Sequence, residues 1–308
     1  MEAQQGASNE ASNAEQQSAW YRLRLPDFSP AAIAESGQCF RMFADTEPKS
    51  YWLIAHGKLL KIREVASEEY AFSCSVDEFE RVWKDYFDLN KNYSEYRAIV
   101  PAEDQYLQRA MRYGKGIRIL RQEPFEALIS FIISQRRSVP AIRTAVAKLS
   151  AAFGTPLAPP CTGASEPAAA TATACSAAGA PFYAFPTAEQ LAAADLEQLA
   201  ACGLGYRTGF VSACARSVAE GSLDLEGLAR ISTPDLIAAL MELRGVGIKV
   251  ASCAALFGYH RLDAAPVDVW MARVIQHVYG GEFPPAYAEC AGVLQQYLFY
   301  YARMERQF

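Results

Sequence analysis

Lys249 is the residue of this chain whose position points most clearly to chemistry. It lies in the segment LRGVGIKVASC (residues 243–253), just after a Gly-Val-Gly turn and in the first turn of an expected helix. The positive end of a helix dipole disfavours a cation there, which favours the neutral form of the amine. A neutral amine can attack a sugar carbon and form a Schiff base. The alternative interpretation is a solvated surface lysine.

Asp268, in the segment DAAPVDVWM (residues 263–271), is the carboxylate that would complement this amine. A helix is expected to begin here, and aspartate is a good N-cap residue, which by itself explains its presence. A cap also holds a carboxylate rigidly beside the preceding loop. Close to Lys249, it could stabilise an oxocarbenium ion that develops on a sugar. The two residues together favour cleavage of a glycosidic bond.

Gly245, Val246 and Gly247 separate two expected helices, STPDLIAALMEL and IKVASCAALFG, and so predict a helix-hairpin-helix. Glycines allow close approach of the backbone, and the amides at the start of the second helix form an anion site that fits a DNA phosphate. An ordinary helical hairpin with a glycine C-cap is the alternative. Cys253 shares a helical face with Lys249, although the same pattern is typical of a core cysteine.

The amino-acid composition limits which other kinds of site and partner the chain can have. The chain has 308 residues, enough for two or three small domains, and a net charge of −5, so that DNA binding would need a local basic face. The eight cysteines include no C-x-x-C pair and there are three histidines, which indicates neither a zinc finger nor an iron–sulfur cluster. Such cysteines are typical of a reducing compartment. We expect a protein of the cytoplasm (bacterial nucleoid) or nucleus, with no signal peptide and no membrane partner.

The hydrophobic pattern predicts an α+β chain. Residues 19–115 carry strand-like runs (WYRLRL, QCFRMF and YWLIAHGKLLKI) and predict an N-terminal antiparallel, twisted β-sheet domain with a few helices. Residues 116–308 carry helix patterns with caps and glycine stops, and predict an all-α domain. Residues 1–18 predict a disordered polar tail, and the Ala/Pro/Thr-rich residues 155–182 predict a flexible insertion.

The motifs LRGVGIKVASC and APVDVWM resemble those of the helix-hairpin-helix/Gly-Pro-Asp (HhH-GPD) DNA glycosylases. Within that superfamily they are most similar to the 8-oxoguanine DNA glycosylase/AP lyases. The resemblance covers about residues 23–304. Further segments resemble that family in the same order, which is far more specific than one turn: SGQCFRM (36–42), GIRILRQEPFEALISFIIS (116–134), GLGYR (203–207) and LQQYLFYYARM (294–304).

This resemblance implies a two-part helical domain with the active site in the cleft between its parts. It implies that Lys249 is the nucleophile and Asp268 its catalytic carboxylate. Purely base-excising relatives have the aspartate and lack this lysine, so Lys249 implies base removal followed by β-elimination. The implied enzyme is a monomer that acts on damaged double-stranded DNA without a cofactor, although a structural cation at the hairpin carbonyls is compatible with it.

The resemblance also implies a pocket for the damaged base. Gly37 matches a glycine whose carbonyl accepts the N7–H that 8-oxoguanine has and guanine lacks. Gln295 matches the glutamine that reads the Watson–Crick edge, and Phe299 and Cys253 match the residues that sandwich the base. Taken alone, Phe299 is more often a core residue.

DNA contacts are implied at the same cleft. Tyr206 and Arg207 match the residues that wedge into the base stack and contact the unpaired cytosine; otherwise they are a helix-start aromatic and a solvated arginine. Residues 134–138 depart from the family, where this loop is Asn-rich. Arg136 and Arg137 stand here instead and could fill the gap left by the base or bind phosphate, which leaves the opposite-base preference open. Trp270 stands where eukaryotic members have a phosphate-contacting histidine.

Two other functions fit parts of these patterns. A helix-hairpin-helix glycosylase for another damaged base would share the fold and differ in the pocket, for which the altered loop is the relevant feature. A non-catalytic DNA-binding module would keep the hairpin and would need neither Lys249 nor Asp268. A plain helical scaffold explains none of the ordered motifs.

Overall fold

The structure of this chain is a computed structural model that describes residues 20–157 and 181–305. The predicted tail over residues 1–18 and most of the predicted insertion over residues 155–182 lie outside the described residues. The two ends of that insertion are described: residues 156 and 183 form a β-bridge, and Phe182 is buried against Trp52. Among the described residues, no helix is long and apolar enough to cross a membrane.

The N-terminal part is a five-stranded antiparallel sheet, which confirms the predicted class. The β3–β4 hairpin turns at His56 and Gly57, both with positive φ, as the tight turn of a two-residue hairpin requires. This turn falls where the His-Gly-Lys sequence predicted it. The strand order is β1-β5-β4-β3-β2, with β1 (Tyr21–Arg24), β2 (Met42–Ala44), β3 (Ser50–Ala55), β4 (Lys58–Ala66) and β5 (Glu69–Phe72).

Short helices cover one face of this sheet. Helix α2 (Pro30–Glu35) packs beside β2, and a second, continuous helical segment runs through α3 (Val76–Glu78), η1 (Phe79–Trp83) and α4 (Lys84–Tyr86). The residues that they bury against the sheet are mostly large and aromatic, and they form a core separate from that of the helical part. This core includes Leu60, Phe72, Phe79, Trp83 and Phe87.

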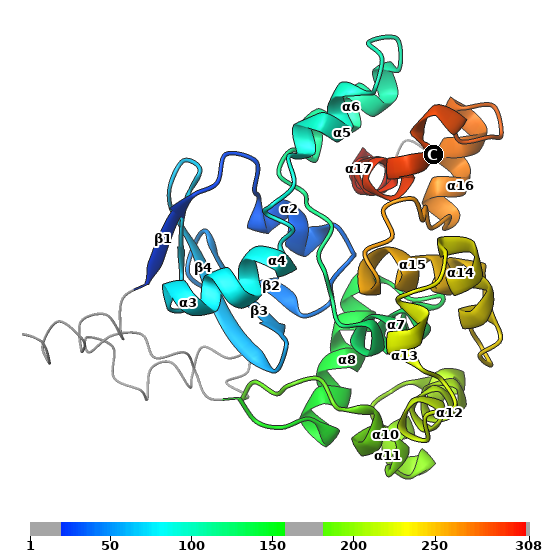
Figure 1. Cartoon of the computed structure of the whole chain (residues 1–308). Helices are drawn as coiled ribbons and strands as arrows, with labels where there is room; N and C mark the ends of the chain where they lie inside the picture. Colours follow the sequence, from blue (N-terminus) through cyan, green and yellow to red (C-terminus); the bar gives the residue numbers. More distant parts are fainter. Residues whose placement is uncertain (1–19, 158–180, 306–308) are drawn as a thin grey trace, which may run out of the picture.

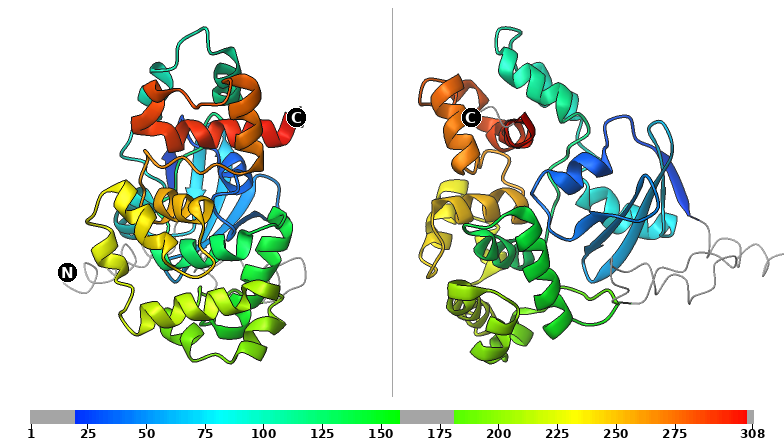
Figure 2. Two further views of the ribbon diagram at one scale, coloured as in Figure 1. Left: turned by 90° about the vertical axis from the view of Figure 1, so that its right-hand side faces the viewer. Right: turned by 180° about the vertical axis from the view of Figure 1, so that it is seen from behind.

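The remaining helices form a stack beside the sheet, with α7 and α15 in the middle (Figures 1 and 2). Helix α7 is apolar on nearly every side. Nearly all of its residues are buried, as expected for a helix without a polar face. The helices are α5 (Tyr93–Ala98), α6 (Gln105–Tyr113), α7 (Pro124–Ser134), α8 (Val139–Phe153), α10 (Ala188–Ala192), α11 (Leu196–Ala201), η2 (Gly205–Arg207), α12 (Thr208–Ala219), α13 (Leu225–Leu228), α14 (Thr233–Met241), α15 (Ile248–Gly258), α16 (Val269–Val278), η3 (Pro285–Cys290) and α17 (Ala291–Glu305).

Helix α6 does not lie with the sheet that precedes it in the sequence. It packs along α17, at the end of the stack that also holds α16 (Figures 1 and 2). Tyr106 of α6 contacts Tyr301 edge-on, and Asp104 at its N-cap accepts hydrogen bonds from Tyr279 and Tyr287. The helical part therefore includes residues on the N-terminal side of the predicted division at residue 115.

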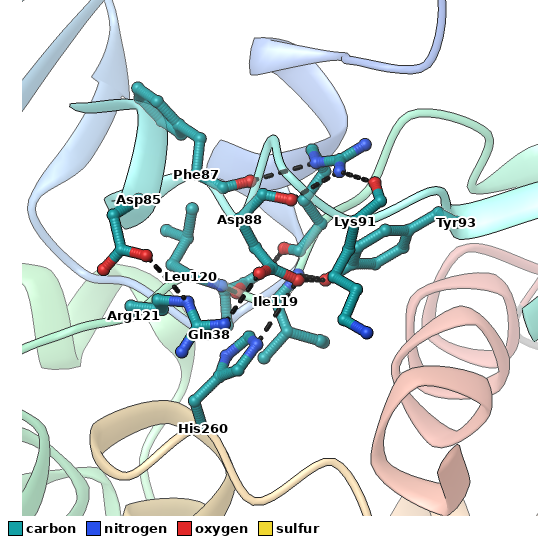
Figure 3. A network of polar contacts seen from close by, with 11 residues as sticks. Gln38, Asp85, Phe87, Asp88, Lys91, Tyr93, Ile119, Leu120, Arg121 and His260 are labelled. Carbon is teal, nitrogen blue, oxygen red and sulfur yellow. Dashed lines mark hydrogen bonds and ion pairs between the residues drawn. The ribbon is translucent and has the colours of Figure 1, made fainter. Parts of the chain in front are cut away.

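A buried carboxylate joins the two parts of the chain (Figure 3). Asp88 follows the helix that covers the sheet, and its Oδ2 lies 3.3 Å from Nε2 of His260, just beyond α15. Its Oδ1 pairs with Arg121 at 2.9 Å, and the Tyr93 hydroxyl donates to Oδ2. Burial alone would raise the pKa of Asp88, but the contacts with His260 and Arg121 outweigh it and lower the pKa below the usual value.

We predict that Asp88→Asn lowers the free energy of unfolding by about 1–3 kcal/mol at pH 7, because a buried charge partner is lost. Since the pKa of Asp88 is lower in the folded chain, its contribution exists above the unfolded value of about 3.9 and disappears as pH falls through the folded value. The difference between the two proteins should therefore shrink below about pH 4.

Denaturant titrations over this pH range measure the effect. Asp85→Asn is the matched control, because Asp85 is exposed and pairs with the same Arg121 at 3.5 Å. It should change stability by no more than about 1 kcal/mol. Equal losses for both variants would contradict the role given to Asp88.

Candidate active site

Lys249 lies where the hairpin sequence predicts, in the first turn of α15. Gly247 is the N-cap of this helix and provides no side-chain cap. The Lys249 side chain is half-buried, and its Nζ lies 5.1 Å from the centre of the Phe131 ring on α7. The amine thus lies over the face of an aromatic ring and borders the cleft.

Asp268 is the N-cap of α16, also as predicted. Its Oδ1 accepts hydrogen bonds from the backbone amides of Trp270 and Met271 at 3.0 and 2.9 Å. These bonds satisfy two amides of the first helical turn and fix the direction of the carboxylate. A carboxylate held in this way needs little reorganisation when positive charge develops beside it.

The charges of Lys249 and Asp268 both affect the pKa of Cys253, whose side chain is buried. Burial raises the pKa of the Cys253 thiol and the negative charge of Asp268 adds to the rise, while Lys249 opposes it through its charge and a hydrogen bond. The thiol therefore stays protonated and forms an apolar wall. Cys253 lines a small cavity together with Lys249 and Asp268, so the three side chains surround one point.

Two connected cavities contain this point. The outer one has a volume of about 790 Å³ and includes Lys249, Asp268 and the residues around the cleft mouth. The inner one, about 40 Å³, collects every residue predicted for the base pocket: Gly37, Cys253, Gln295 and Phe299, together with Lys249 and Asp268. The sequence placed these residues in four separate segments, and the fold brings them together.

Gln295 shows that the inner cavity is built for a polar ligand. The residue is 4% exposed, and its Oε1 is buried without a hydrogen-bond partner among the described residues. An unpaired buried acceptor destabilises the protein by about 1–3 kcal/mol. A ligand N–H that reaches this oxygen would remove the penalty, so the side chain is poised to recognise a donor.

Phe299 closes the inner cavity against Gly37. A Cβ added to Gly37, which has φ +79°, would stand 3.1 Å from Cε1 of the Phe299 ring. The guanidinium of Arg303 lies over the other part of this ring, 5.5 Å from its centre. With the ring this close to Gly37, a flat base that inserts between Gly37 and Phe299 must displace Phe299.

The hairpin itself combines a strained turn with a helix start. Gly245 has φ +85°, a conformation that favours glycine, and it packs against the ring of Phe210. Val246 is buried and anchors the turn, while Gly247 leaves the first amides of α15 without a side-chain cap. The carbonyl of Gly245, considered above for a cation, accepts a hydrogen bond from Nε2 of Gln135 at 3.0 Å. The first amides of α15 therefore remain available to an anion, as the sequence predicts.

The remaining predicted DNA contacts surround the outer cavity. Tyr206 is 57% exposed at its rim, and Trp270 lines it with Arg273 stacked 5.5 Å from its ring centre. Arg136 is exposed in a left-handed backbone conformation, with φ +52°. Arg137 also lines the cavity and donates to the carbonyl of Gly203.

Arg207 differs from the DNA-facing arginine that its motif implies. It is only 5% exposed, and its guanidinium donates to the backbone carbonyls of Gln135 and Leu204. The sequence did not predict two further contacts of the site. One is between Phe131 and the amine of Lys249, and the other is between Gln135 and the hairpin. In the sequence, Phe131 is one of many apolar residues of α7, and no local pattern separates it from the core.

Comparison with known proteins identifies the family of this chain. Residues 21–128 match the family described as 8-oxoguanine DNA glycosylase, N-terminal domain, and residues 129–291 match the HhH-GPD superfamily of base excision DNA repair proteins. The chain therefore belongs to the HhH-GPD superfamily of base excision DNA repair enzymes. A curated relative, the probable N-glycosylase/DNA lyase of Methanothermobacter thermautotrophicus, is 28% identical over 70% of this chain and 72% of its own.

Solved structures extend the similarity over nearly the whole chain. A structure of MBOgg1 in complex with a low affinity DNA ligand superposes with a TM-score of 0.80 and is 30% identical, covering 93% of this chain and 96% of that one. The Clostridium acetobutylicum 8-oxoguanine glycosylase/lyase, in complex with double-stranded DNA containing cytosine opposite 8-oxoG, also gives a TM-score of 0.80. It is 29% identical and covers 94% of this chain and 96% of its own.

We predict that Gly245→Ala destabilises the hairpin by about 1–3 kcal/mol, because alanine is strained at this φ and its Cβ would lie 2.3 Å from the Phe210 ring. Gly247→Ala is the control, because φ is negative there and a Cβ would meet no atom within 4 Å. Thermal unfolding in the absence of DNA separates the two. Equal melting temperatures would show that the turn does not require glycine at residue 245.

Proposed function

We propose that this chain is a bifunctional DNA glycosylase/AP lyase that excises 8-oxoguanine from duplex DNA. The observation that carries the proposal is that Lys249 and Asp268 line the same inner cavity as Gly37, Gln295 and Phe299. A nucleophile, a carboxylate and a polar recognition pocket therefore face one bound nucleotide. The 8-oxoguanine glycosylase/lyase of Clostridium acetobutylicum, similar over almost the whole chain, supports this substrate.

The base must leave the helix to reach this cavity. Tyr206, exposed at the rim, is positioned to wedge into the base stack, and the uncapped amides of α15 are positioned to hold a backbone phosphate. Arg136 and Arg137 add positive charge at the same rim, so a chain of net charge −5 presents a local basic surface to DNA. Displacement of Phe299 would then admit the base.

In the proposed reaction, Nζ of Lys249 bonds to C1′ of the deoxyribose as the C1′–N9 bond breaks. The electron pair of that bond leaves with the base, which takes up a proton. Asp268 stabilises the positive charge that develops on the sugar. After the bonded Nζ gives up one of its two protons, the C1′–O4′ bond breaks and O4′ takes up a proton, which leaves a protonated Schiff base between Nζ and C1′. Its positive charge makes the C2′ proton acidic. Removal of that proton expels the 3′ phosphate and cleaves the strand.

Discrimination against guanine would rest on a donor that only the lesion has. Gly37 borders the inner cavity, and its carbonyl would accept N7–H of 8-oxoguanine, where guanine presents a lone pair. The unpaired Oε1 of Gln295 would accept a donor from the Watson–Crick edge. A glycosylase for another lesion would require a different donor pattern at these two acceptors. A non-catalytic module would not require Lys249 at all.

We further propose that a monomer without a cofactor performs both steps, because the Lys249 amine supplies the covalent chemistry. Among the described residues, no group of histidine, cysteine, aspartate and glutamate side chains could hold a metal ion. Because the proposed covalent chemistry uses the Lys249 amine, activity should survive dialysis against a chelator. The elution volume in size-exclusion chromatography should correspond to about one chain of 33.8 kDa.

We predict that Lys249→Gln abolishes both base excision and covalent trapping by borohydride on an 8-oxoguanine·cytosine duplex, because no amine can attack C1′. The loss of excision should be at least about 1,000-fold. Lys148→Gln, which removes an exposed lysine on α8, should leave both unchanged. Efficient excision by Lys249→Gln would refute the nucleophile assignment.

Gly37→Ala should reduce 8-oxoguanine excision by about 10- to 100-fold, because the added Cβ presses on the Phe299 ring and shifts the carbonyl acceptor. The ratio of lesion to guanine excision should fall with it. Gly57→Ala controls for the backbone cost, since φ is +63° and a Cβ there meets no atom within 4 Å. An unchanged ratio in Gly37→Ala would argue against readout by this carbonyl.

A further inference from the structure

The C-terminal end of α2 is held by arginines from two other helices. The last backbone carbonyls of a helix have no partner within it, so they need donors from elsewhere. The carbonyl of Ala34 accepts a hydrogen bond from Nη2 of Arg143 on α8. The next carbonyl, that of Glu35, accepts one from Nη2 of Arg303 on α17. We call Arg143 and Arg303 the α2 clamp.

Gly37, just beyond this helix end, is the residue whose carbonyl is proposed to meet the base. The carbonyl before it, that of Ser36, accepts from Nε2 of Gln296 at 2.6 Å. The carbonyl after it, that of Gln38, accepts from Nε2 of Gln122 at 2.7 Å. Because both neighbouring carbonyls are bonded, the Gly37 carbonyl keeps its direction as long as the end of α2 stays in place.

The two arginines of the clamp have no carboxylate partner. Among the described residues no salt bridge includes either one. Burial lowers the pKa of Arg303, and the charge of Arg143 adds to this effect, although Glu35 and other groups oppose it. Half-buried cations without carboxylate partners cost stability, which points to a role for their two carbonyl contacts.

The two arginines differ in their distance from the base pocket. A Cβ added to Gly37 would lie 3.4 Å from Nη1 of Arg303, whose guanidinium carbon lies 5.5 Å from the ring centre of Phe299. Arg143 instead donates to Ala34, three residues before Gly37. A variant of Arg143 therefore alters the clamp and leaves the contact between Arg303 and Phe299 in place.

We propose that Arg143 and Arg303 are positioning residues that determine specificity: by holding the end of α2, they keep the Gly37 carbonyl where it accepts N7–H of 8-oxoguanine. This inference rests on the proposed function, because the arginines act through the base that enters the inner cavity. They need not touch the base or the DNA backbone. Loss of either one should therefore weaken recognition of the lesion and leave other contacts with DNA unchanged.

The test measures the affinity of the full chain carrying Lys249→Gln, which should not cleave DNA, for three duplexes. They contain 8-oxoguanine, guanine or a tetrahydrofuran abasic analogue, each opposite cytosine. Arg143→Met or Arg303→Met, added to this chain, should lower the preference for 8-oxoguanine over guanine by about 3- to 10-fold, the effect of one hydrogen bond. Affinity for the guanine and tetrahydrofuran duplexes should not change.

Arg22→Met is the matched control, because Arg22 is exposed on the edge strand β1, and it should change none of the affinities. Arg143→Lys keeps the charge and a donor, and should restore most of the preference that Arg143→Met loses. If Arg143→Met does not fold, Arg143→Gln replaces it with the same expectation, because glutamine is too short to reach the carbonyl of Ala34.

Equal weakening on all three duplexes would overturn the proposal, because it would mean that the arginines bind the DNA backbone or only maintain the fold. An unchanged preference in Arg143→Met would also overturn it, since Arg303 would then act through Phe299 alone. If the chain with Lys249→Gln alone binds the 8-oxoguanine and guanine duplexes equally, the proposed substrate fails and this inference fails with it.

Discussion

The close packing of α15 on α7 is the constraint on which the rest of the site depends. At the far end of α15, a Cβ on Gly258 would stand 3.1 Å from both Ala127 and Pro124, so a larger residue there would push the two helices apart by a few tenths of an ångström. Phe257 stacks on Phe131, with ring centres 5.4 Å apart. The same Phe131 supports the amine of Lys249. The position of Lys249, the proposed nucleophile, is therefore set by core packing and not by a surface loop.

The N-termini of α15 and α16 both lie at the cleft. Their first backbone amides are used for different purposes there. The amides at the start of α16 are bonded to Asp268 and hold a carboxylate in place. The start of α15 has no side-chain cap, so its positive end remains directed at the cleft. One helix start fixes the group that stabilises a cation, and the other can hold a phosphate. The N-cap residue, Asp268 in α16 and Gly247 in α15, determines whether the first amides bond to a side chain or remain free.

Local patterns predicted the elements that local forces determine. The His56–Gly57 turn, the hairpin glycines and the Asp268 cap each depend on residues adjacent in sequence, and the structure places them as predicted. The position of the Arg207 side chain depends on its contact with the Gln135 carbonyl. Gln135 is distant in sequence, so no local pattern predicts that contact. The packing of α6 on α17 likewise joins distant segments, so the position of the domain boundary required the folded chain.

The central claim is that one side chain, Lys249, forms the covalent bond to the sugar. The most direct measurement is peptide mapping of the borohydride-trapped complex between the wild-type chain and an 8-oxoguanine duplex, by proteolysis and mass spectrometry. We predict that the deoxyribose remnant is attached to Lys249 in the peptide that contains the Gly245–Gly247 hairpin. Attachment to another lysine or to the N-terminal amine would contradict it.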